Sequence, residues 1–309
     1  MQLIVTIDTE EEFDWNAPFS RHGYGTDNIN IYHQTMSEFY KKQGVVPVIV
    51  ASYPIFQHHK TASLLKSLHD NHDAIVGVHL HPWVTPPEIE DLTPKNSYVG
   101  NLPYDTEYQK IKTMTDVYHD VIGTAPTIYK AGRYGIGKNT DKILSDMGYI
   151  YDLSYHAGKD FTYDGGPDMT HIRHNIFTSD TGIIHIPVTG TFIGQSKKNK
   201  ILQNLVLKEY LYGLPIRGLL SKLNLCNFIT LTPENTPLEY MKKMTLTGME
   251  QGIDVFQMTF HSSIFQTGYI SYVQTADDVE NMKKTIQDYI LFFKELGGKT
   301  GDFRENFVL

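Results

Sequence analysis

The chain has 309 residues, of which 40% are hydrophobic and 12% aromatic, and this excludes disorder as its main state. Its 27 basic and 35 acidic residues give a net charge of −8, which argues against a protein that coats nucleic acid. A single cysteine, Cys226, excludes an internal disulfide and suits a reducing compartment.

The first residues, Met-Gln-Leu-Ile-Val, carry no basic charge ahead of the apolar run, and acidic residues follow soon after, so we expect no signal peptide. No stretch reaches the roughly 18 apolar residues of a membrane span. We therefore expect a soluble, cytoplasmic protein. The basic cluster at residues 197–200 is interpreted as a solvated loop.

Apolar runs typical of buried strands alternate with helical patterns along the chain. Strands are predicted over residues 3–7, 45–51, 74–78, 127–131, 149–152, 183–188 and 255–260. Helices are predicted over residues 31–43, 61–71, 106–122, 139–147, 237–251 and 275–296, with a mostly helical insertion at 198–225. Such repeated units indicate an α/β fold with a parallel sheet. We predict one domain over residues 1–309 that forms a closed barrel, with an open doubly wound sheet as the alternative.

Ionisable side chains stand where the predicted strands end. They are Asp8, His79, His81, Arg133, Asp152 and His261. In a parallel barrel the carboxyl ends of all strands lie on one face, which carries the active site. We therefore expect these residues to converge at one mouth of the barrel.

The segment His79-Leu80-His81 has the most specific local geometry. Residues i and i+2 of an extended chain point to the same side, so two imidazoles can bind one metal ion. A nearby carboxylate would complete three protein ligands and leave a position for water, which is typical of catalytic zinc. The alternative is two ordinary histidines at a strand end.

The acidic run that follows the first strand offers a base and a ligand. Asp8 is a candidate general base, kept ionised by a guanidinium such as Arg133, and Glu10 is a candidate metal ligand. We interpret Glu11 and Glu12 as parts of a solvated turn. The alternative role for Arg133 is a structural ion pair.

Two later residues complete the candidate set. His261, in Thr-Phe-His-Ser-Ser, suits the protonation of a leaving amine across the pocket from the base. Its alternative is a hydrogen-bonded histidine at a strand end. Asp152 is a candidate catalytic residue, and a role as a helix cap or turn residue is the alternative.

Five motifs in order resemble those of the polysaccharide deacetylase family, the metal-dependent carbohydrate esterases with NodB homology. They are Thr-Ile-Asp-Thr-Glu (6–10), Gly-Val-His-Leu-His-Pro-Trp (77–83), Ala-Gly-Arg-Tyr-Gly (131–135), Tyr-Asp-Leu-Ser (151–154) and Thr-Phe-His-Ser-Ser (259–263). The resemblance implies a distorted (β/α)7 barrel, a divalent metal that is commonly zinc, and hydrolysis of N- or O-acetyl groups on sugars.

The resemblance also implies a role for each residue. Asp8 would activate the water, Arg133 would orient Asp8, and His261 would be the general acid. His79 and His81 would bind the metal, and we place Trp83 and Tyr134 among the substrate-binding residues. The chain departs from the family where a second aspartate is usual, since Thr9 stands there and leaves Asp8, Glu10 or no acid as the ligand. The histidines are also spaced i, i+2 instead of the usual i, i+4.

These inferences lead to one hypothesis about function and two alternatives. We hypothesise a deacetylase that acts on a nucleotide-linked, lipid-linked or oligosaccharide precursor of a surface polysaccharide, of the O-antigen or capsule type. One alternative is an amidohydrolase or phosphoesterase barrel with two metal ions. The other is a non-catalytic carbohydrate-binding protein on a degenerate deacetylase fold, for which Thr9 is the best support.

Overall fold

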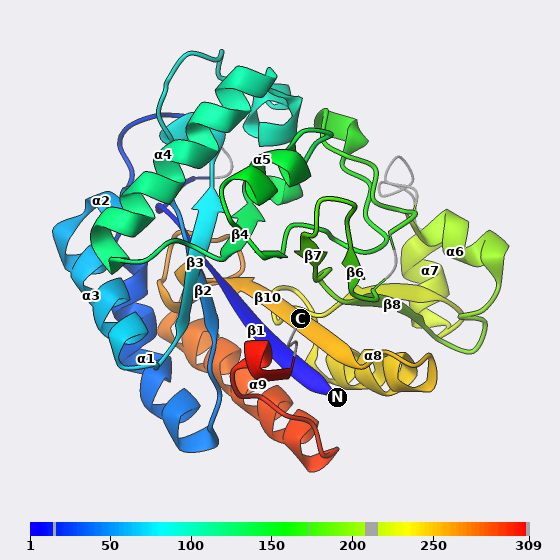
Figure 1. Cartoon of the computed structure of the whole chain (residues 1–309). Coiled ribbons are helices and arrows are strands. Elements are labelled where there is room, and N and C mark those ends of the chain that lie inside the picture. Colours follow the sequence, from blue (N-terminus) through cyan, green and yellow to red (C-terminus); the bar gives the residue numbers. More distant parts are fainter. Residues whose placement is uncertain (15–16, 173, 208–215, 307–309) are drawn as a thin grey trace.

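A computed structural model describes residues 1–14, 17–172, 174–207 and 216–306 of the chain. Its centre is a curled sheet with the strand order β10-β1-β2-β3-β4-β5-β7-β6 (Figure 1). The parallel strands are β1 (Gln2–Thr9), β2 (Val48–Ala51), β3 (Ile75–Leu80), β4 (Ile128–Ala131), β5 (Tyr151–Asp152), β7 (Ile184–His185) and β10 (Val255–His261). The antiparallel strand β6 (Phe177–Thr178) lies at the edge, and β8 (Gly190–Ile193) pairs with β9 (Asn227–Thr230) in a separate hairpin.

The predicted α/β class is confirmed, and each parallel strand coincides with a predicted one. The strands follow one another around the sheet in chain order, with β10 beside β1, as in a barrel and unlike a doubly wound sheet. The barrel was expected to close, but among the described residues no continuous ladder of backbone hydrogen bonds joins β7 to β10. Thr189 N–H donates to Gln257 O at 3.2 Å, and Thr259 N–H donates to Leu231 O at 3.2 Å, so single hydrogen bonds span the side between β7 and β10.

Most helices pack around the outside of the sheet, and two lie beside the separate hairpin (Figure 1). They are α1 (Asn28–Gln43), α2 (Tyr53–Gln57), α3 (His59–Asp70), α4 (Tyr104–Ile122), α5 (Thr140–Asp146), α6 (Lys200–Leu207), α7 (Ile216–Lys222), α8 (Leu238–Glu250) and α9 (Ala276–Glu295). Gly44, at φ 61°, ends α1, because glycine adopts this left-handed conformation without strain. The predicted helical insertion holds α6 and α7, while its residues 208–215 lie outside the described residues. No described helix is both long and apolar enough to cross a membrane.

Alternation along the strands explains why polar groups meet inside the barrel. On β1, Leu3, Val5 and Ile7 face the helices, whereas Ile4 packs in the inner apolar cluster. The same alternation points the Asp8 side chain inward near the end of the strand, because successive side chains point to opposite faces. Farther round the sheet, His79 of β3 pairs with Lys130 of β4. The interior is therefore apolar at its base and ionisable at its mouth.

Candidate active site

A cavity of about 200 Å³ opens at the mouth of the barrel. It is lined by Asp8, Glu10, His79, His81, Tyr98, Ala131, Arg133, Tyr134, Phe161, Tyr163 and His261. The structure thus brings together seven of the residues singled out from the sequence. Asp152 and Trp83 are not among its lining residues.

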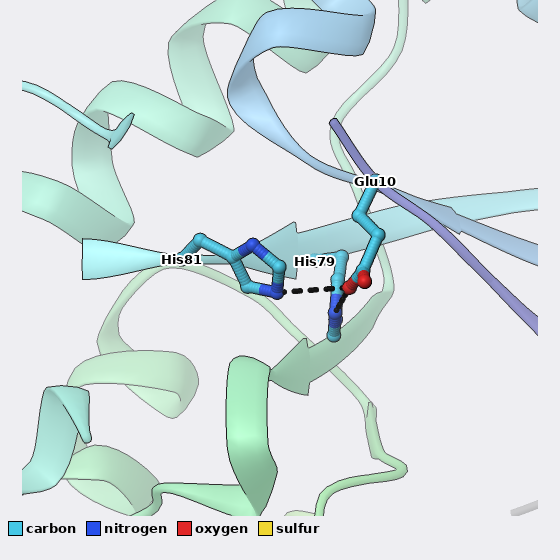
Figure 2. A group of neighbouring side chains, drawn as sticks. All are labelled: Glu10, His79 and His81. Atoms are coloured by element: carbon cyan, nitrogen blue, oxygen red, sulfur yellow. Dashed lines mark ion pairs between the residues drawn. The ribbon is translucent and has the colours of Figure 1, made fainter. Parts of the chain in front are cut away.

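Glu10, His79 and His81 form the one group of metal-ligand type found among the described residues, and all three are buried (Figure 2). The Nε2 atoms of His79 and His81 lie 3.4 and 3.1 Å from Glu10 Oε2. Two imidazole nitrogens and a carboxylate oxygen that face one point suit a divalent ion such as zinc. Glu10, directly after β1, therefore supplies the carboxylate of the group despite Thr9.

The other nitrogen of each imidazole is already engaged. His79 Nδ1 donates to Lys130 O at 3.1 Å, and a carbonyl oxygen can only accept. His81 Nδ1 lies 2.8 Å from Glu11 Oε1. Partners of this kind fix the ring orientation and leave the Nε2 lone pairs for a metal. The donor set and its supporting contacts therefore fit a metal ion.

The charges around the group attract a cation. Burial alone would lower the pKa of His81, but the carboxylates of Glu11 and Glu10 outweigh it and raise the pKa to about 10. Burial alone would raise the pKa of Glu10, yet His261 and His81 hold it well below its usual value. Bound metal and protons compete for the same imidazole lone pairs.

Glu11 and Glu12 are not in a solvated turn, and that prediction was wrong. Glu11 is 1% exposed and holds His81, while Glu12 is 7% exposed and accepts from the Asn28 N–H at the start of α1. A run of acids looks solvated in a sequence, but here the histidine and the helix start supply buried partners.

Replacing Glu11 with glutamine is expected to weaken metal binding by about 10–100-fold, because the carboxylate that orients His81 is lost. The matched control is Glu12→Gln, which changes the next carboxyl group along the chain, one that contacts the start of α1 and not His81. Titration with zinc in a competition assay measures both. Equal affinities for Glu11→Gln and the control would show that the Glu11 contact does not support the site.

Asp8 is held by Lys130, and the expectation that Arg133 holds it was wrong. Lys130 Nζ lies 2.6 and 2.7 Å from the two carboxylate oxygens of Asp8 and 2.8 Å from Thr259 Oγ1. Both charged groups are buried. A lysine in the inner face of β4 reaches Asp8 directly, whereas Arg133 lies beyond the strand end.

Arg133 instead belongs to the rim of the cavity. Its guanidinium pairs with Asp164, donates to Ser97 Oγ at 2.5 Å and lies 4.5 Å from the ring centroid of Tyr98. Arg133 and Tyr134 have φ values of 54° and 61°, a left-handed conformation that costs energy in residues other than glycine and is common at functional sites. This turn presents both side chains to the cavity.

His261 also lines the cavity, with Nε2 3.9 Å from Glu10 Oε1. Its Nδ1 lies 2.9 Å from Glu234 Oε1, which also accepts the His261 backbone N–H at 2.8 Å. Burial alone would lower the pKa of His261, but Glu234 and Glu10 raise it to about 10. In the metal-free protein the imidazole is therefore a cation with Nε2 toward the cavity.

Asp152 lies away from the cavity, so the structure does not bring it to the site as expected. It accepts from the Ser154 hydroxyl and lies 2.9 Å from His185 Nδ1, and all three are buried. Ser154 Oγ in turn accepts the Ala131 N–H at 2.7 Å. The cluster supports the end of β4 from behind, which corresponds to the structural alternative.

His185 makes the stability of this cluster depend on pH. Burial alone would lower its pKa, but Asp141 and Asp152 raise it to about 9. Because the folded pKa exceeds the unfolded one, the stabilisation is fully present below about pH 6.5 and is lost as the pH rises through 9. We expect urea unfolding to show a loss of about 2–3 kcal/mol over this window. In His185→Asn the loss of stability should be smaller by this amount, while the loss due to His81 and His261, whose pKa values are also raised, to about 10, should remain. An unchanged pH profile in the variant would contradict the assignment.

Trp83 does not line the cavity, contrary to its proposed contact with substrate. Its buried ring stacks on His81 at a centroid distance of 4.3 Å and packs against Phe13 and Phe19. Trp83 thus supports the metal-binding histidine from behind. Tyr134, in contrast, lines the cavity and lies edge-on to His156 at 5.0 Å.

Sequence reasoning missed four charged partners. They are Glu11, Lys130, Asp164 and Glu234. Lys130 had a signal, since a lysine between Tyr129 and Ala131 interrupts an otherwise apolar strand. Asp164 ends a short 3-10 helix and Glu234 lies in a turn, and only the folded chain shows what they contact.

Comparison with known proteins reveals similarity of fold only. No protein-family model and no curated protein matches the chain. A protein assigned as a polysaccharide deacetylase from Mycobacterium smegmatis is 13% identical, with a TM-score of 0.52 over 99% of this chain and 88% of that one. A GH57-type branching enzyme from Pyrococcus horikoshii is 10% identical, with a TM-score of 0.53 over 100% and 70% of the two chains. The chain therefore shares its fold with carbohydrate-active proteins of two kinds.

Proposed function

We propose that the protein is a metal-dependent hydrolase that removes acetyl groups from a sugar. The observation that carries this proposal is the oriented Glu10, His79 and His81 group beside the Asp8–Lys130 pair, in one cavity with His261. A bound divalent ion would polarise the acetyl carbonyl and lower the pKa of water. The likeness in fold to the protein assigned as a polysaccharide deacetylase supports this reading.

Asp8 is proposed as the general base. Its carboxylate lines the cavity, and the Lys130 ammonium fixes its position and balances its charge. A base held in place in this way accepts a proton from water that enters the cavity. Lys130 takes the orienting role that the family resemblance assigned to Arg133.

His261 is proposed as the general acid. Glu234 holds its Nδ1 side, so that the Nε2 proton faces the cavity. Donation of this proton to the departing amine or alkoxide completes the cleavage. Asp8 and His261 are register partners on the adjacent parallel strands β1 and β10, and both line the cavity that holds the metal group.

The site does not fit a glycoside hydrolase, although one protein of similar fold is a GH57-type branching enzyme. A glycosidase needs a protonated carboxyl group with a raised pKa opposite a second carboxylate. The two carboxyl groups that line the cavity are Asp8, which pairs with an ammonium, and Glu10, whose pKa is well below its usual value. Neither is suited to donate a proton.

The substrate we propose is an acetylated amino sugar of a surface-polysaccharide precursor, with zinc as the metal. Tyr98, Tyr134, Phe161 and Tyr163 surround the metal group with rings, which suit the apolar face of a sugar. The single, buried cysteine fits a cytoplasmic protein.

Acetate release tests the proposal. Acetylated amino sugars, free and nucleotide-linked, are incubated with zinc-loaded protein before and after chelation. We expect release that stops on chelation and returns with zinc. Release that is indifferent to chelation, or sugar binding without any release, would refute it, and the latter would favour a non-catalytic carbohydrate-binding protein.

A further inference from the structure

The insertion between β8 and β9 exposes an unusual amount of apolar surface. Ile201 of α6 is 72% exposed, and Ile216, Leu219 and Leu223, on or just after α7, are 38%, 56% and 56% exposed. On a helix, the spacing i, i+3, i+7 places the last three on one face. Exposed apolar side chains grouped in this way mark a surface that contacts something else.

In both α6 and α7, only part of the apolar face is buried. Val206 of α6 and Leu220 of α7 share a small core with Cys226, against which Phe192 and Phe228 of the hairpin pack. Figure 1 shows the two helices together at the margin of the molecule, beside β8. The hairpin thus holds the helices in place, and their remaining apolar faces have no described partner within the chain.

The charge of this segment is opposite to that of the rest of the protein. Residues 197–225 hold six of the 27 basic residues and one of the 35 acidic residues, so the segment carries +5 and the remainder −13. Lys198, Lys200 and Lys222 are exposed and, within the described part of the chain, form no ion pair. Exposed leucines flanked by lysines are typical of helices that lie in the interface of an anionic bilayer.

We propose that α6 and α7 dock the protein onto the surface of an anionic lipid bilayer. The exposed side chains of Ile201, Leu219 and Leu223 enter the interfacial region, and Lys198, Lys200 and Lys222 contact the lipid phosphates. Clustering of cations on an otherwise acidic chain favours a lipid surface over a second copy of the protein. The rest of the second copy's surface is acidic, but in a symmetric pair its matching patch would be equally basic and would repel the first. The cluster at residues 197–200 is then part of a binding surface and not merely a solvated loop.

The docking surface is connected to the cavity by packing. Thr230 of β9 has its hydroxyl 3.5 Å from His156 Nε2, and the His156 ring lies against Tyr134, which lines the cavity. A bilayer-docked chain would therefore be linked to its cavity through β9. Docking itself requires no hydrolysis, so it is tested separately from the proposed function.

Vesicle flotation tests the proposal with vesicles of phosphatidylcholine alone or mixed with phosphatidylglycerol. We expect the full-length protein to float with the anionic vesicles only, and less so as salt is added. Leu219→Glu with Leu223→Glu should weaken binding at least tenfold, since two apolar contacts are replaced by charges repelled by the lipid. Replacing Lys198, Lys200 and Lys222 with glutamine should weaken it roughly a hundredfold, at about fivefold for each lysine.

Matched controls distinguish this surface from general effects. Leu246→Glu with Leu291→Glu places the same two charges at exposed leucines of α8 and α9, and glutamine at Lys112, Lys142 and Lys284 removes the same charge elsewhere. Both should float as the parent protein does. Absence of binding to anionic vesicles, or equal loss in the controls, would overturn the proposal. A dimer in solution that Leu219→Glu with Leu223→Glu dissociates, without vesicle binding, would overturn it in favour of a second copy.

Discussion

Replacing Lys130 with methionine is expected to lower the free energy of unfolding by about 3–5 kcal/mol. The change leaves the buried Asp8 carboxylate without the ammonium that lies 2.6 Å away. Urea unfolding in the presence of chelator measures the effect on the protein itself. Removing both charges in Asp8→Asn with Lys130→Met should restore most of the lost stability, because no unpaired charge then remains inside the barrel.

The control for this cycle is Lys112→Met on the surface of α4. Lys112 pairs with Asp116 at 2.6 Å, but both side chains are more than half exposed. Exposed pairs contribute about 0–1 kcal/mol. If Lys130→Met lowers the free energy of unfolding no more than Lys112→Met does, the pair of Lys130 with Asp8 does not stabilise the fold as proposed.

Replacing Asp8 with asparagine is expected to lower kcat for acetate release by about 10²–10⁴-fold. An amide of the same shape fills the position, but it cannot accept the proton from water. Metal content should be unchanged, since Glu10, His79 and His81 form the metal group without Asp8. The readouts are initial rates and elemental analysis on the same samples, at a temperature where the variant is folded.

Asp116→Asn provides the matched control, because it makes the same change on the surface of α4. It should retain full activity. An Asp8→Asn protein that keeps its zinc and turns over at the parent rate would remove Asp8 from the mechanism. Loss of zinc together with activity would instead make Asp8 a ligand, as the sequence had left open.

The fold was largely predictable because its signal is local. Each inner strand is a short apolar run, and its alternation decides which residues turn inward, so Asp8 and His79 were placed at the mouth of the barrel from the sequence. The looser side between β7 and β10 was not predictable. It depends on single hydrogen bonds of Thr189 and Leu231, which lie in irregular segments.

The site was predictable in its ligand types but not in its partners. The i, i+2 spacing placed His79 and His81 on one side, and Glu10, directly after β1, lies beside them. Burial of Glu11 depended on a histidine 70 residues away. Likewise the pairing of Asp8 with Lys130 joins residues 122 positions apart, and no local pattern encodes such a contact.

The most direct test of the account is anomalous scattering from crystals grown with zinc. The account predicts one anomalous peak per chain, at about 2 Å from Nε2 of His79, Nε2 of His81 and a carboxylate oxygen of Glu10. Crystals of His79→Ala should lack that peak. Zinc-soaked crystals of the parent protein with no peak among these three side chains, or with the ion bound elsewhere, would contradict the account.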